Sequence, residues 1–283
     1  MFNQFLVTGA SGNLGREVVK VLLSTGYVVK AGTRDVRKIQ PSENLEAVQF
    51  DYADPTTFDA ALEGIASLFL VAPPMDPEAP AKLIPFLKKA KKVGIKHVVF
   101  NSALGVDHNE QAPLRIVERA LMGIGVPYTI LRPNFFMENF STGFIAPMIK
   151  HQNGMFLAAG DGKTSFISTK DIARVVVAVL AKEHYGKAYN LTGPEVLDHH
   201  QVAKIISEAI GREVVYLALT EGAMLQGARE KGMPESAVQY MAVLYSAVRA
   251  GYMALQTGDV EHITGRKPLV FSDFVLNNKN CWL

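Results

Sequence analysis

Three glycines near the start of the chain have the spacing of a turn that binds phosphate groups. Gly9, Gly12 and Gly15 separate an apolar run, Phe5 to Val7, from a segment with apolar residues at helical spacing that begins at Leu14. These patterns predict a buried strand, a tight turn and an amphipathic helix. Glycine permits the turn, the approach of a ligand and the packing of the helix, while amides at the helix start face a pyrophosphate. The alternative is a glycine-rich turn that binds no ligand.

A basic residue, Arg34, follows the second predicted strand, at 27–33. Sites that select NAD place an acid at the end of this strand, where it binds the ribose hydroxyls. A guanidinium there can instead hold a 2′-phosphate bidentately and stack on the adenine, so the sequence favours NADP over NAD. The adjacent Asp35 weakens this argument, and Arg37 and Lys38 also fit a solvated helix start.

The elements that must position these residues alternate regularly over the first half of the chain. Short apolar runs alternating with helical segments predict a doubly wound parallel sheet, a Rossmann fold, in residues 1–133. Residues 134–283 are expected to form mainly a smaller C-terminal α+β lobe, with segments at about 155–192 returning to the core. The strands are expected at 5–7, 27–33, 45–50, 67–72, 97–100 and 127–131, and later helices at 170–180, 198–210 and 221–257, the last broken at Pro234.

Composition excludes several classes of protein. The 283 residues are 48% apolar and 20% charged, as in ordinary globular proteins. A net charge of +2, from 29 basic and 27 acidic residues, predicts no contact with nucleic acid. The single cysteine, Cys281, fits a reducing cytoplasm, and the start of the chain leaves no room for a signal peptide. The apolar runs are too short to span a bilayer, which favours a cytoplasmic protein. The histidines are scattered without the spacing of metal ligands, so no metal site is expected.

The glycine spacing, together with the stretch LRPNFFMENF at 131–140, resembles the NmrA-like family of atypical short-chain dehydrogenases. The resemblance covers nearly the whole chain. That family holds NAD(P)H-dependent quinone and triphenylmethane-dye reductases, and also NADP-sensing regulators without enzyme activity. The resemblance therefore implies an NADP(H)-dependent oxidoreductase acting on a small aromatic substrate or, alternatively, a non-catalytic NADP(H) sensor with a regulatory protein partner. An oligomer is compatible with either.

The resemblance also implies where ligands bind. In relatives an acid at the position of Asp51 accepts a hydrogen bond from the adenine amine, and ligands lie beyond the carboxyl ends of the strands. The expected cofactor-binding residues are Gly9, Ser11, Gly12, Asn13, Leu14, Thr33, Arg34, Asp51, Tyr52, Val71, Ala72, Pro73, Asn101, Ser102 and Pro133. An apolar substrate pocket is expected from Met75, Asn134, Phe135, Phe136 and Phe140, with plain core packing as the alternative.

The proton donor usual in short-chain dehydrogenases, a Tyr-x-x-x-Lys pair, is missing from this sequence. Counting back from Glu118, which relatives share, places Leu114 at the lysine position and Glu110 at the tyrosine position. Tyr128 and Arg132 have the right spacing but lie on a predicted strand, where the geometry differs. No catalytic residue is assigned. An acceptor that takes hydride without a proton delivered in the same step, such as a quinone or a cationic dye, fits best.

Overall fold

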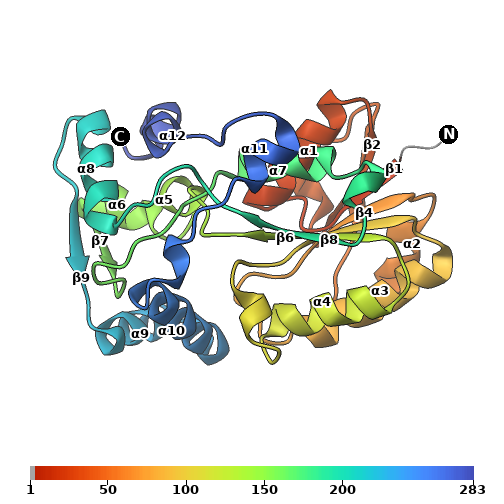
Figure 1. Cartoon of the computed structure of the whole chain (residues 1–283), viewed down its shortest axis with the longest axis horizontal. Coiled ribbons are helices and arrows are strands. Elements are labelled where there is room, and N and C mark those ends of the chain that lie inside the picture. Colours follow the sequence, from red (N-terminus) through yellow and green to blue (C-terminus); the bar gives the residue numbers. More distant parts are fainter. Residues whose placement is uncertain (1–3) are drawn as a thin grey trace. The chain divides into compact units, whose positions relative to one another are not determined.

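The computed structural model describes residues 4–283 (Figure 1). The chain divides into two units. Within the described residues, the first unit comprises the chain up to Pro74, Glu78–Pro133 and Lys170–Asn190. The second comprises Met75–Pro77, Asn134–Thr169 and Leu191–Leu283. The segment expected to return to the core is therefore divided, with 170–190 in the first unit and 155–169 in the second.

A seven-stranded sheet forms the centre of the first unit. The five pairs that join β3 through to β6 are all parallel, as predicted. The strand order reverses between β1 and β4, and ligands of such sheets bind beyond the carboxyl ends of the strands at this switch point. The order is β3 (Leu45–Gln49), β2 (Val28–Thr33), β1 (Gln4–Val7), β4 (Ser67–Val71), β5 (His97–Asn101), β6 (Tyr128–Pro133) and β8 (Lys187–Leu191).

Helices cover both faces of this sheet (Figure 1). α1 (Asn13–Ser24) and α7 (Thr169–Ala178) lie on one face, and α2 (Phe58–Leu62), α3 (Ala79–Val93) and α4 (Pro113–Gly123) on the other. Because both faces are buried, the strands read as continuous apolar runs, which made them recognisable in the sequence. Short 3₁₀ turns complete the unit: η1 (Val36–Lys38), η2 (Pro55–Thr57), η3 (Val106–His108) and η4 (Lys182–His184).

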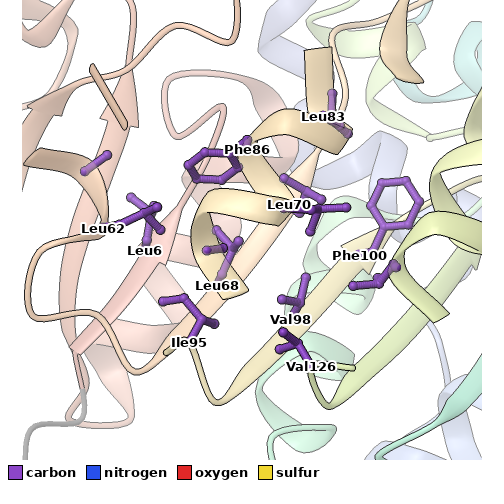
Figure 2. Close-up of a cluster of buried hydrophobic side chains, with 14 of the residues drawn as sticks. Leu6, Leu62, Leu68, Leu70, Leu83, Phe86, Ile95, Val98, Phe100 and Val126 are labelled. Carbon is purple, nitrogen blue, oxygen red and sulfur yellow. The ribbon is translucent and has the colours of Figure 1, made fainter. Parts of the chain in front are cut away.

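A cluster of buried apolar side chains fills the layer between the sheet and helices α2, α3 and α4 (Figure 2). The strands contribute every second residue, because alternate side chains point to the same face. Burial of one such side chain contributes roughly 1.5–3 kcal/mol to the stability of the fold. Members labelled in Figure 2 are Leu6, Leu62, Leu68, Leu70, Leu83, Phe86, Ile95, Val98, Phe100 and Val126.

The second unit contains a two-stranded parallel sheet and short helices. Its sheet pairs β7 (Gly154–Leu157) with β9 (Val215–Ala218), and neither strand was predicted. Asp198 and Gln201 form the predicted capping box of α8, and Pro234 separates α9 from α10 as predicted. The helices are α5 (Glu138–Ser141), α6 (Ala146–Gln152), α8 (His199–Ile210), α9 (Glu221–Glu230), α10 (Glu235–Arg249), α11 (Asp259–Thr264), α12 (Phe271–Asn278), η5 (Tyr252–Ala254) and η6 (Lys279–Cys281).

Candidate cofactor-binding site

The glycine turn between β1 and α1 has the geometry that its sequence predicts. Gly9 has a φ of +62°, and a Cβ on it would lie 2.8 Å from the Val71 side chain. A Cβ on Gly15 would come within 2.2 Å of the Gly9 carbonyl oxygen, so only glycine lets α1 begin this close to the turn. Gly12 precedes the first residue of α1, and no side chain caps the helix there. The first amides and the positive end of the helix dipole are thus available to an anion.

Hydrogen bonds of Thr8 and Tyr52 to the main chain of β4 hold the start of this turn in place. The Thr8 hydroxyl donates to the Phe69 carbonyl at 3.1 Å and accepts from the Val71 amide at 3.0 Å. The Tyr52 hydroxyl lies 2.9 Å from the Val71 carbonyl and 3.0 Å from Thr8 Oγ1, either of which can accept its proton. Burial raises the pKa of Tyr52, so its hydroxyl stays a donor. Tyr52 therefore holds the ends of β1 and β4 together, and contact of its ring with a cofactor stays a prediction.

The charges after β2 are arranged so that one guanidinium is left free. Asp35 accepts from Arg37 through Nε at 2.8 Å and Nη2 at 3.2 Å, and the hydrogen bond from this side chain lowers the pKa of Asp35. Arg34 is exposed and forms no ion pair within residues 4–283. The neighbouring acid is therefore occupied and does not neutralise Arg34. Thr33 donates to the Ser11 hydroxyl at 3.1 Å, which joins the end of β2 to the glycine turn.

Asp51 follows β3 and keeps part of its carboxylate open. Its Oδ1 accepts from the Ala53 amide at 3.0 Å, and its own amide donates to the Thr57 hydroxyl at 3.2 Å. Oδ2 has no partner in the part of the chain that the structure describes. It can accept a hydrogen bond from an adenine amine.

The carboxyl ends of the central strands bring together a further group of expected residues. Val71, Asn101 and Leu131 are level across β4, β5 and β6, and Ala72, Pro73 and Pro133 extend beyond them. Asn101 is only 7% exposed, yet its Oδ1 has no hydrogen-bond partner among the described residues. Buried polar atoms are nearly always paired, so this oxygen marks a place where a ligand donor fits.

Six charged side chains form a network next to Ser102. Glu118, fully buried, accepts from Arg132 at 2.9 and 2.8 Å and from Arg115 at 2.8 Å. Arg132 also donates to Asp107 at 2.6 Å. Burial opposes ionisation of Glu118, but hydrogen bonds, led by those from Arg132, outweigh it and lower its pKa. The helical spacing of Arg115 and Glu118 was the one local sign of this network, which sequence reasoning missed.

The dyad positions carry no proton donor. Glu110, at the expected tyrosine position, accepts from Arg119 at 2.7 Å and from Arg115 at 2.9 Å. The hydrogen bonds from Arg119 and Arg115 lower the pKa of Glu110 to about 2, so it is ionised at neutral pH. Leu114, at the lysine position, packs against the apolar cluster. Neither side chain can protonate a substrate.

The residues expected to line a substrate pocket lie in the second unit. Asn134 is buried and donates to the Ser165 hydroxyl at 2.7 Å and the Met253 carbonyl at 2.8 Å. Phe140 is fully buried, with its ring centroid 5.1 Å from that of Phe166. Both side chains thus take part in packing within the second unit, and their contact with a substrate stays a prediction. The other three, Met75, Phe135 and Phe136, are half-buried, and their contact with a substrate stays a prediction.

Metal-binding clusters and membrane-spanning helices are both absent from residues 4–283. No group of three or more histidine, cysteine, aspartate or glutamate side chains is placed there to hold a metal ion. No helix in the same range is long and apolar enough to cross a membrane.

The chain is similar to known proteins in sequence and in structure. A model of the NmrA-like family matches residues 1–252. The chain is 36% identical to agroclavine dehydrogenase of Claviceps fusiformis, with 98% of each protein covered. It is 32% identical to NAD(P)H azoreductase of Xenophilus azovorans, over 95% of this chain and 96% of that protein. Its structure is similar to an NADPH-dependent quinone oxidoreductase of Escherichia coli complexed with NADPH, with a TM-score of 0.84, 25% identity and coverage of 96% and 99%.

Proposed function

The chain belongs to the NmrA-like family, and from that premise we propose that it is an NADP(H)-dependent oxidoreductase that transfers hydride to an electron-poor aromatic acceptor. The observation that carries the proposal is a set of unpaired polar groups at one edge of the sheet in the first unit. The uncapped start of α1, the free Arg34 and the unpaired Asn101 Oδ1 all lie at the carboxyl ends of the strands. These groups match the diphosphate, the 2′-phosphate and a hydrogen-bond donor of one dinucleotide.

Membership of the family supports binding of NAD(P), and the charges after β2 support the choice of NADP. Because Arg37 occupies the carboxylate of Asp35, no free acid stands where the ribose hydroxyls of NAD are bound. Arg34 is then the group that distinguishes the two cofactors. Asp51 Oδ2 is our candidate for the adenine amine.

The state of Glu110 supports the choice of acceptor. When bound, the reduced nicotinamide supplies a hydride. Reduction of an aliphatic ketone would also require a positioned acid, which is typically worth ~10²–10⁴ in rate. Glu110 is ionised and Leu114 is apolar, so the dyad positions offer none. A cationic dye becomes neutral on accepting hydride, and a quinone becomes a hydroquinone anion that water protonates later. We retain Met75, Phe135 and Phe136 as candidates for contact with such an acceptor.

A panel of acceptors tests this function. Purified protein with NADPH is incubated with quinones, triphenylmethane dyes and an aliphatic ketone, and loss of the NADPH absorbance is followed. We expect oxidation with the aromatic acceptors, at rates ~100-fold or more above the ketone. Calorimetry on the same samples measures NADPH binding. Tight binding without oxidation by any acceptor would contradict the enzyme and support the non-catalytic sensor instead.

A further inference from the structure

The loop at 102–112, which follows the carboxyl end of β5, is fixed mainly by charge. Its first residues extend the sheet, since the Ser102 amide donates to Leu131 at 2.7 Å and the Leu104 amide to Pro133 at 3.0 Å. Beyond Leu104 the loop has no buried apolar side chain, and residues 108–111 are exposed. A loop with so few apolar contacts is expected to open easily unless other interactions hold it.

Two ion pairs supply that restraint, and both lead to Glu118. Asp107 contacts Arg132 at 2.6 Å, and Glu110 contacts Arg115 at 2.9 Å. The two arginine side chains are only 9% and 8% exposed, and both donate to the fully buried Glu118 carboxylate. Each guanidinium therefore links the loop to the interior of the first unit. Three acids and three bases make the network neutral once Arg119 is included, so no charge is left uncompensated.

We propose that Asp107, Glu110, Arg115, Arg132 and Glu118 act as a clamp that positions the 102–112 loop beside the nicotinamide end of the cofactor site. The inference rests on the proposed function, because the loop borders the strand ends at which that ring would lie. The segment that carries the proton donor in dyad enzymes here carries structural ion pairs. These are positioning residues: they set the geometry of hydride transfer without contacting the reacting atoms.

The clamp predicts a separation between cofactor binding and turnover. The adenine and diphosphate groups depend on the glycine turn and the strand ends β2 and β3, which the clamp does not touch. Releasing the loop would disturb only the reacting end, where small displacements cost large factors in rate. Removing Glu118 itself would leave two buried guanidinium groups without their carboxylate, so a milder variant is the better probe.

Asp107→Asn is that variant, because Asp107 is 27% exposed and the change keeps its shape. Arg119→Gln is the matched control, since it removes the exposed end of the same network and leaves both links to Glu118. We expect Asp107→Asn to lower kcat ~10-fold with an NADPH Kd within ~2-fold of the parent, while Arg119→Gln changes neither. Asp107→Glu keeps a carboxylate at this position, so its kcat is expected to lie between those of Asp107→Asn and the parent.

Hydrogen–deuterium exchange of peptides from 102–112, with NADP⁺ bound, gives a readout independent of turnover. Exchange is expected to rise ~10-fold in Asp107→Asn and to stay unchanged in Arg119→Gln. Equal kcat and equal exchange in the two variants would overturn the clamp. If none of the tested acceptors is reduced by NADPH in the presence of the parent protein, the proposed function fails, and the exchange measurement still decides whether the loop is clamped.

Discussion

Glu118 in the first unit is buried and Glu138 in the second is half-buried, and the hydrogen-bond partners of these two glutamates differ. In the first unit Glu118 accepts from Arg132 and Arg115, and its pKa is lowered even though burial opposes ionisation. In the second unit burial raises the pKa of Glu138, whose carboxylate accepts from the Ser168 hydroxyl at 2.9 Å and the Thr169 amide at 3.0 Å. Guanidinium partners therefore outweigh the effect of burial on the pKa of Glu118, whereas the uncharged donors around Glu138 do not.

A second comparison concerns two buried asparagines, Asn101 at the end of β5 in the first unit and Asn134 in the second. In the first unit the ionised Glu118 network lies beside the end of β5, and the Oδ1 atom of Asn101 at that strand end has no hydrogen-bond partner among residues 4–283. In the second unit the amide of Asn134 and the hydroxyl of Ser165 are bound to each other and to main-chain carbonyls. Unpaired polar groups at a sheet edge mark a ligand site, whereas paired ones fix the fold.

The largest expected effect comes from exchanging each glutamate for glutamine. Glu118→Gln leaves two buried arginines without a countercharge and should destabilise the protein by ~3–5 kcal/mol. Glu138→Gln keeps an acceptor for the Thr169 amide, and the Ser168 hydroxyl can reverse its role, so its cost should stay within ~1 kcal/mol. Urea unfolding at neutral pH measures both. Equal losses would show that burial alone, rather than charge pairing, governs these sites.

Some features of the fold and the site could be predicted from the sequence, and others could not. The parallel strands and the glycine turn were predictable because they rest on local signals: continuous apolar runs and a spacing of three glycines. The Glu118 network was not, because Asp107 and Arg132 meet only after β5, α4 and β6 have assembled. The role of Asn134 was hidden for the same reason, since its partner Met253 lies 119 residues away.

Each unit contains a buried histidine with a lowered pKa, so we expect acid to destabilise both units. Burial lowers the pKa of His97 in the first unit to about 4, with a further contribution from His184. Burial likewise lowers the pKa of His199 in the second unit to about 4. Unfolded histidine takes up its proton near pH 6.5, so each site stabilises the fold above that pH. The stabilisation is lost as the pH falls towards 4, by roughly 2 kcal/mol per histidine between pH 7 and 5.

Urea unfolding at several pH values checks this expectation. His97→Asn should remove about half of the histidine-dependent fall in stability, and His151→Gln, at an exposed site, should leave the fall unchanged. Glu138 should oppose the trend, because a raised carboxyl pKa means that the native state binds the proton more readily. Glu138→Gln should therefore steepen the acid loss. A shallower loss in that variant would contradict the direction assigned to Glu138.

The last prediction concerns exposed cations, where the comparison predicts that only an unpaired one binds ligand. Arg34→Ala should weaken NADPH binding by ~10–100-fold and NADH binding by less than ~3-fold, because only NADPH carries the 2′-phosphate. Arg37→Ala in the first unit frees Asp35, and Arg229→Ala in the second removes only the pair with Glu235. Calorimetry should show a modest loss of NADPH affinity for the former and none for the latter. A similar loss of NADH and NADPH affinity in Arg34→Ala would show that its guanidinium does not distinguish the two cofactors.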